Sequence, residues 1–222
     1  MNKALIGIVL VLLLFLTSCN FLSGGTVVND PCKSLLDSAK DNCYAESRQC
    51  SKVKNDAMRD SCVVELAQAK ADITVCNLIL SEKTKGFCQE KIAELNNDRV
   101  MCEKIEDSYW QNNCHFHLAI NNNDSTVCAL ISPGEQKDDC YRTIVFATNN
   151  SALCSFLSPT DKESCIYHVA IASKDASLCQ QQSVPVNRDA CRIKIAAETN
   201  NVAICLTIKN SLIREDCQKQ FT

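Results

Sequence analysis

Residues 114–131 read CHFHLAINNNDSTVCALI, and this stretch contains the signals from which the fold is predicted. Leu118 and Ala119 follow Cys114 at helical spacing. Asn123, the last of three asparagines, is suited to the left-handed backbone conformation that ends a helix. Asp124 is then a strong N-cap for a second helix, which carries Cys128. One helix therefore ends and another begins within this stretch, and each contains a cysteine.

The cysteine spacing indicates that the stretch is one period of a repeat. From Cys50 onward the gaps alternate between 12 and 14 residues, apart from one gap of 11 between Cys154 and Cys165. The period is therefore about 26 residues. An Asp or Asn, predicted to be a helix N-cap, stands four residues before the second cysteine of every 14-residue gap. These residues are Asp72, Asp98, Asp124, Asn150, Asp175 and Asn201.

Further turn signals keep the same register. Helix ends are predicted at Asn97, Asn123, Asn149 and Asn200. A second set of helix starts is predicted at Ser81, Asp107, Ser132, Ser158, Ser183 and Asn210. Pro133 and Pro159 follow two of these serines, and Ser132 with Glu135 fits a capping box. Each unit is therefore predicted to be a hairpin of one short and one longer helix.

Apolar residues four, five and often seven positions after each longer-helix cysteine are predicted to form one stripe on that helix. Because a single hairpin cannot bury this stripe alone, successive hairpins should stack. We therefore predict an all-α fold, a disulfide-stapled α-solenoid of short helical hairpins over residues 31–222. Residues 31–62 read as an atypical capping unit, because only 7 positions separate Cys43 from Cys50.

Two disulfide schemes fit the spacing. Pairing across the 14-residue gaps leaves Cys32, Cys43, Cys50 and Cys217 without partners, and the symmetry of the turns does not decide between the schemes. Pairing across the gaps of 11 or 12 uses all 16 cysteines after Cys19, so completeness favours it. The predicted disulfides are Cys32–Cys43, Cys50–Cys62, Cys76–Cys88, Cys102–Cys114, Cys128–Cys140, Cys154–Cys165, Cys179–Cys191 and Cys205–Cys217.

The N-terminus has the composition of a secretory signal, predicted over residues 1–18. Lys3 precedes 13 apolar residues, which is short for a membrane span. Leu16-Thr17-Ser18-Cys19 resembles the lipobox of prokaryotic lipoproteins. This resemblance implies lipidation of Cys19, cleavage before it and membrane anchoring. The alternative is an ordinary signal with an incidental cysteine. Residues 19–30 are predicted to be the lipidated anchor and a polar tether.

Composition restricts the location and the partners. Seventeen cysteines among 222 residues are typical of an oxidising compartment. A net charge of −3 argues against nucleic acid as a partner. Together with the lipobox, these features predict the extracytoplasmic side of a cell envelope. The absence of Asp after Cys19 favours the outer membrane or the cell surface, if the source is a Gram-negative bacterium.

No residue is assigned to catalysis, to a metal or to a cofactor. His115 and His117 are two positions apart, so they point in different directions from a helix. His117 and His168 occupy one repeat column that reads as a variable surface position. The sequence contains no Cys-x-x-Cys pair, phosphate-binding loop or nucleophile elbow. We therefore expect no enzyme.

Charged residues repeat before the longer-helix cysteines. A basic residue stands three positions before most of them, and in five units an acidic residue follows it. Asp60, Asp138, Glu163, Asp189 and Glu215 are these acids. A ladder that faces a partner and ordinary solvated ion pairs are the two interpretations, and the second is favoured.

The repeat region looks like the disulfide-stapled helical-hairpin proteins that some prokaryotes secrete, built loosely in the manner of tetratricopeptide arrays. It departs from tetratricopeptide repeats in its period of about 26 rather than 34 residues. No binding residue is carried over. The expected function is a membrane-anchored, non-catalytic scaffold that binds an unknown protein or envelope component. A structural spacer or coat component is the first alternative, and an enzyme or small-ligand carrier is the second.

Overall fold

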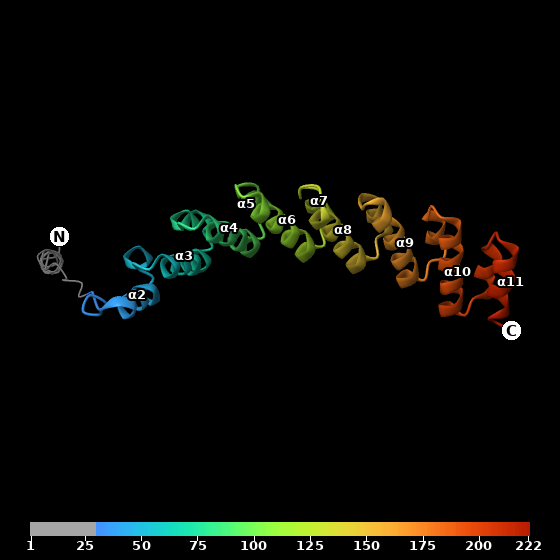
Figure 1. The fold of residues 1–222 in the computed structure, drawn as a ribbon, viewed down its shortest axis with the longest axis horizontal. Helices are drawn as coiled ribbons and strands as arrows, with labels where there is room; N and C mark the ends of the chain where they lie inside the picture. The colour runs from blue at the N-terminus through green and yellow to red at the C-terminus, as the bar shows by residue number, and fades with distance from the viewer. Residues whose placement is uncertain (1–29) are drawn as a thin grey trace, which may run out of the picture.

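The computed structural model describes residues 30–222, which form a single file of helical hairpins with the N-terminal and C-terminal units at opposite ends (Figure 1). Every regular element in this range is helical, as predicted. The predicted signal peptide, Cys19 and residues 20–29 of the tether lie outside the described residues. Among residues 30–222, no helix combines the length and the apolar composition that crossing a membrane requires.

Each hairpin consists of a short helical segment followed by a longer helix. The longer helices are α2 (Asp37–Glu46), α3 (Asp56–Lys70), α4 (Glu82–Asn96), α6 (Ser108–Asn122), α8 (Glu135–Thr148), α9 (Pro159–Ser173), α10 (Pro185–Thr199) and α11 (Ser211–Lys219). The short segments are η1 (Cys50–Lys52), η2 (Ile73–Leu78), α5 (Arg99–Glu103), α7 (Ser125–Cys128), η3 (Ser151–Phe156), η4 (Leu178–Gln181) and η5 (Val202–Thr207). In the first hairpin a turn at residues 31–34 takes the place of the short segment.

Each hairpin contains one disulfide, which joins its short segment to its longer helix. The bridges are Cys32–Cys43, Cys50–Cys62, Cys76–Cys88, Cys102–Cys114, Cys128–Cys140, Cys154–Cys165, Cys179–Cys191 and Cys205–Cys217. They are the pairs that completeness favoured, and their Cα atoms are 5.5–5.8 Å apart. We number the units one to eight in this order. Bridges of this kind are typical of an oxidising, extracytoplasmic compartment.

The predicted caps of the short segments are confirmed at five of six positions. Asp72, Asp98 and Asp124 each accept a hydrogen bond from the amide two residues on, at 2.8–2.9 Å. Asn150 and Asn201 accept the same bond in later units. These bonds satisfy amide groups that a helix start leaves without intrahelical acceptors. The prediction for Asp175 is wrong, because its bond from the amide of Ser177 belongs to a turn before η4, which begins only at Leu178.

The predicted caps of the longer helices are confirmed at four of six positions. Ser81, Asp107, Ser158 and Asn210 accept amide hydrogen bonds from the first turns. The predictions for Ser132 and Ser183 are wrong. Helix α8 begins at Glu135 after Gly134, whose φ is 149°, and α10 begins at Pro185 after Val184. The amides of Ser132 and Ser183 are instead bound by Asn112 and Glu163 of the preceding units. The Ser132–Glu135 capping box therefore does not form.

The four predicted asparagine helix ends are confirmed. Asn97, Asn123, Asn149 and Asn200 have φ of 49–52°, in the left-handed region. After Asn97, the amide of Asp98 donates to the carbonyl of Ala93, which is the 6→1 bond of a Schellman motif. Ala93 and the alanines of the same column in other units, Ala67, Ala119, Ala170 and Ala196, are completely buried.

The core is a series of layers between successive units. In units three to seven, positions four and five after the longer-helix cysteine are buried, as in Ile92 and Ala93. Position seven was predicted to join them, but this is wrong, because Leu95 is 60% exposed. Each residue turns about 100° around the helix axis, so positions four and five lie about 40° and 140° from the cysteine, both on the same side of it. Position seven lies about 20° from the cysteine on the opposite side, away from the buried positions.

The first unit is shorter than the others. Helix α2 continues three residues past Cys43, whereas α3 continues eight residues past Cys62. The short gap between Cys43 and Cys50 therefore corresponds to about two missing helical turns. Asp30 closes this end of the array, since its carboxylate accepts a hydrogen bond from Tyr44 at 3.0 Å and pairs with Lys52 at 2.9 Å.

Candidate functional site

The three histidines have different surroundings. His115 is 3% exposed and lies in the core, where neither ring nitrogen has a hydrogen-bond partner. Burial lowers the pKa of His115, because the charged ring would lose its hydration. His168 is exposed and places its ring edge against Phe146, with centroids 5.9 Å apart. These two histidines therefore read as a core residue and a surface residue.

His117 meets two carboxylates of the preceding unit. Its Nε2 lies 3.6 Å from Glu90 Oε1, and its Nδ1 lies 3.8 Å from Glu94 Oε1. Glu90 and Glu94 are one turn apart on α4, and His117 projects from the neighbouring helix α6. One potential ligand atom from each of the three residues lies within 4.8 Å of the others. We call Glu90, Glu94 and His117 the Glu–Glu–His cluster.

The Glu90 carboxyl group is deeply buried. Glu90 is 2% exposed, and its separation from His117 is too long for a hydrogen bond. Burial raises the pKa of Glu90 to about 7, with a smaller upward contribution from the charge of Glu94, while Lys91 acts in the opposite direction. Near neutral pH this side chain therefore exchanges a proton readily, and a nearby cation would favour its charged form.

This cluster was not predicted from the sequence, because the spacing of the histidines was considered only relative to one another. A signal was present in the repeat columns. The position two after the longer-helix cysteine is Val64, Phe116, Tyr167 or Ile193 in four other units. Arg142 and Lys219 are the charged residues of two further units, and Glu90 is the only acid in this mostly apolar column.

The repeated charges before the longer-helix cysteines serve bonds within the chain. Asp60 is 5% exposed and accepts amide hydrogen bonds from Leu80 and Ser81 of the next unit, at 3.2 and 3.1 Å. Basic residues of the neighbouring column bind carbonyl groups, as Lys137 does with Ala129 at 2.8 Å. Glu163 binds the amide of Ser183 in the next unit in the same way, whereas Arg59 and Lys85 form ion pairs with the exposed Asp56 and Glu82, as the second interpretation expects. These columns therefore supply both bonds between units and ordinary solvated ion pairs.

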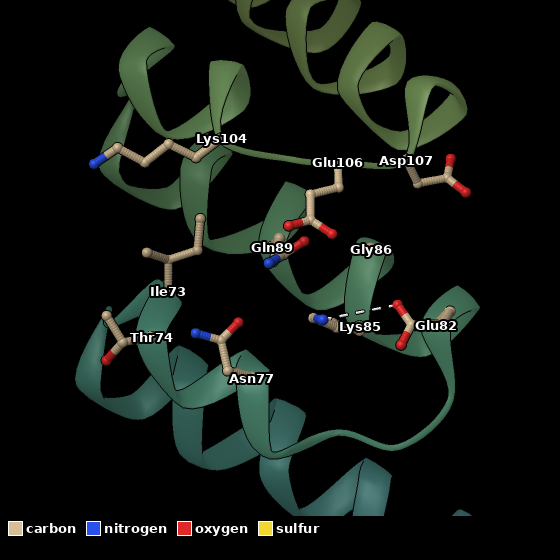
Figure 2. A pocket seen from close by; sticks show the side chains of 10 residues that line it. All are labelled: Ile73, Thr74, Asn77, Glu82, Lys85, Gly86, Gln89, Lys104, Glu106 and Asp107. Atoms are coloured by element: carbon tan, nitrogen blue, oxygen red, sulfur yellow. Dashed lines mark ion pairs between the residues drawn. The ribbon is translucent and has the colours of Figure 1, made fainter.

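A cleft of about 310 Å³ lies between the third and fourth units (Figure 2). Lys85, Gln89, Lys104 and Glu106 are among the side chains around it, and Lys85 pairs with Glu82 at 3.7 Å. Gly86 lies on its wall, at the position that Asp60 occupies in the second unit. The Trp110 indole packs on this glycine, so an added Cβ would lie 2.6 Å from Trp110 Cγ.

Comparison of the chain with protein-family models, with curated proteins and with solved structures finds no match. Its function is therefore argued from its own residues. Departures from the repeat pattern gather at the junction of the third and fourth units, which holds the cleft, Gly86 with Trp110, and the Glu–Glu–His cluster.

Proposed function

We propose that the protein is a membrane-anchored extracytoplasmic lipoprotein whose repeat array is a non-catalytic scaffold for a protein or envelope component. The anchor rests on the lipobox resemblance at Cys19. All sixteen cysteines of residues 30–222 are bonded to one another, so none of these is left to pair with Cys19. Lipid attachment gives this cysteine a function that needs no disulfide partner.

The single-file arrangement of the hairpins carries the scaffold proposal (Figure 1). Because successive units stack along one direction, most of the surface stays accessible instead of being folded into one compact core. Each hairpin keeps its shape through its own disulfide, so this surface is preorganised before a partner arrives, which lowers the cost of binding. Tetratricopeptide arrays use extended surfaces of this kind in the same way.

The cleft between the third and fourth units is the proposed contact region. Side chains of both charges surround it, among them Lys85, Lys104 and Glu106. Sites for small ligands are mostly apolar and enclosed, whereas a partly open charged cleft suits the polar surface of a protein. This composition favours a macromolecular partner over the alternative of a small-ligand carrier.

The anchor is tested by fractionation and mass spectrometry of the full-length protein. The wild-type protein should enter the membrane fraction and carry acyl chains on the peptide that begins with Cys19. A Cys19→Ser variant should be released in soluble form, while a Ser23→Ala control variant should remain bound. Unmodified Cys19 in membrane-associated wild-type protein would contradict the anchor.

The scaffold is tested by affinity capture from envelope extracts with oxidised full-length protein. Lys104→Glu reverses a charge beside the cleft, and Lys209→Glu makes the same change at an exposed position in the last unit. We expect capture of a defined partner to fail with Lys104→Glu and to persist with Lys209→Glu. Folded wild-type protein that captures no partner, and whose phenotype survives exchange of internal repeats, would favour a structural spacer instead.

A further inference from the structure

The Glu–Glu–His cluster joins two units at one point. Helices α4 and α6 pack against each other, so the stacking of the third and fourth hairpins brings His117 to both glutamates. Lys91, on the same helix as the glutamates, binds Glu94 Oε2 at 2.8 Å. This ion pair leaves Glu94 Oε1, the atom that faces His117, without a hydrogen bond.

Each of the two carboxylates has an oxygen atom that faces His117 without a hydrogen-bond donor. Glu94 Oε1 is buried, and no group of residues 30–222 donates a hydrogen bond to it. The Glu90 side chain is 3% exposed, and its Oε1 faces His117 Nε2 beyond hydrogen-bond distance. A buried carboxylate without a donor is unfavourable unless a proton or a cation neutralises it. Lys91 pairs with the other oxygen of Glu94, so the charges that stay without a partner are those of Glu90 and of Glu94 Oε1, and a cation between the three side chains would serve both.

Hairpin packing alone does not explain Glu90. Val64 and Ile193 are the corresponding residues in the second and seventh units, so an aliphatic side chain is compatible with this position of the helix. Replacing a buried charge with a well-packed apolar residue is often neutral or stabilising. A role for the carboxylate itself accounts for its presence here.

We propose that Glu90, Glu94 and His117 bind a divalent transition-metal cation of the zinc type. One imidazole nitrogen and two carboxylate oxygens are ligands that Zn²⁺ accepts at about 2.0–2.2 Å. Ligand atoms that share such an ion lie about 3–3.5 Å apart. Only one nitrogen of His117 can bind the ion, and the three ligand atoms, one from each residue, lie within 4.8 Å of one another, so binding requires them to approach by up to about 1.5 Å. His117 retains 40% exposure of its side chain, which gives its ring room to turn.

Three protein ligands leave at least one position of the ion to water. The ion would also bridge α4 and α6, so the two units would be joined by coordination bonds in addition to packing. Binding requires the charged form of Glu90 and a neutral imidazole nitrogen, and the ion therefore displaces protons as it enters.

His168 supplies a matched control for the test. It occupies the same repeat column as His117, three residues after the longer-helix cysteine. The preceding unit presents Phe146 to it, in the column where the third unit has Glu94. On this proposal a histidine in this column binds the ion only where carboxylates face it. His117→Asn should therefore weaken metal binding, and His168→Asn should not.

The experiment is a titration of the oxidised full-length protein with ZnCl₂ against a chromophoric chelator, after prior treatment with EDTA. We expect one Zn²⁺ per chain in the wild-type protein. Glu90→Gln and His117→Asn should each weaken binding by more than about 10-fold, because even the loss of a group that only hydrogen-bonds a metal ligand weakens binding by about that factor. His168→Asn should leave the affinity unchanged.

Substitution with Co²⁺ supplies a second readout, because its visible absorption reports the ligands directly. Circular dichroism establishes that each variant is folded, and Glu90→Gln preserves the shape of the side chain while removing its charge. Wild-type protein that binds neither Zn²⁺ nor Co²⁺ at a molar equivalent would overturn the proposal. Equal losses of binding in His117→Asn and His168→Asn would also overturn it.

Discussion

Replacement of Gly86 by alanine tests the packing at the junction of the third and fourth units. An alanine Cβ at this position would lie 2.6 Å from Trp110 Cγ and 2.8 Å from Nε1, and closer still to Cδ1. Non-bonded heavy atoms rest about 3.5–4.0 Å apart, so the indole must retreat by about 1 Å or more. The substitution therefore pushes α4 and α6 apart at this point.

Two opposing effects set the expected magnitude. Overpacking of this kind costs about 1–3 kcal/mol. Alanine is better than glycine in a helix interior by about 1 kcal/mol. The clash should win, with a net loss of about 1 kcal/mol in local stability, because the indole also has an edge contact with Phe87 at 5.8 Å to lose.

Native-state hydrogen exchange measured on peptides from α4 and α6 is the suitable assay, since neighbouring units can open separately. Gly86→Ala should accelerate exchange there about fivefold and leave α11 unchanged, given that 1.4 kcal/mol corresponds to tenfold. In a Trp110→Ala background the clash is absent, so the same change should slow exchange by a similar factor. Slower exchange on adding Gly86→Ala to the wild-type protein, or the same effect in both backgrounds, would refute the reasoning.

Three further predictions concern the bonds between units, the buried acid and the disulfides. Asp60→Ala removes the acceptor of two amides in the next unit and should cost about 2–4 kcal/mol locally, whereas Ser61→Ala on the exposed side of α3 should change stability by less than about 0.5 kcal/mol. Exchange at the start of α4 measures both, and equal effects would contradict the link. In EDTA, stability at the third unit should fall as pH rises from about 4.5 to about 7, because the folded-state pKa of Glu90 is raised to about 7. Thermal unfolding of Glu90→Gln should lack this slope, and its persistence would assign it to another group. The double change Cys102→Ser and Cys114→Ser opens a loop of 12 residues and should destabilise the fourth unit by about 3 kcal/mol. Limited proteolysis should then cleave first in α5 and α6, and cleavage spread evenly over the units would contradict independent stapling.

The elements that sequence reasoning predicted correctly depend on bonds between residues close in the chain. Asp124 caps the next segment through an amide two residues away, and Asn123 ends α6 through its own left-handed backbone. Such bonds are present whatever the neighbouring unit does. The caps predicted at Ser132 and Ser183 failed because each serine stands eight residues before its longer-helix cysteine, whereas the confirmed caps stand seven before theirs, so α8 and α10 begin after Gly134 and Val184 instead.

The candidate sites depend instead on contacts between neighbouring units. Glu90 and His117 meet because of the angle at which α6 stacks on α4, and Trp110 reaches Gly86 across the same junction. The sequence shows Glu90 as an unusual residue in its column but contains no local signal that names its neighbour.

The sequence by itself determined the period, the hairpins, most of the helix ends and the preferred disulfide scheme, because cysteine spacing and capping act within a few residues to one hairpin length. Only the tertiary structure decided which side chains of adjacent hairpins touch. Those contacts depend on the crossing of whole helices, which is set by the packing of many side chains together. For this reason the histidine of CHFHLAINNNDSTVCALI that carries the metal proposal, His117, could be evaluated only beside the glutamates of the preceding unit.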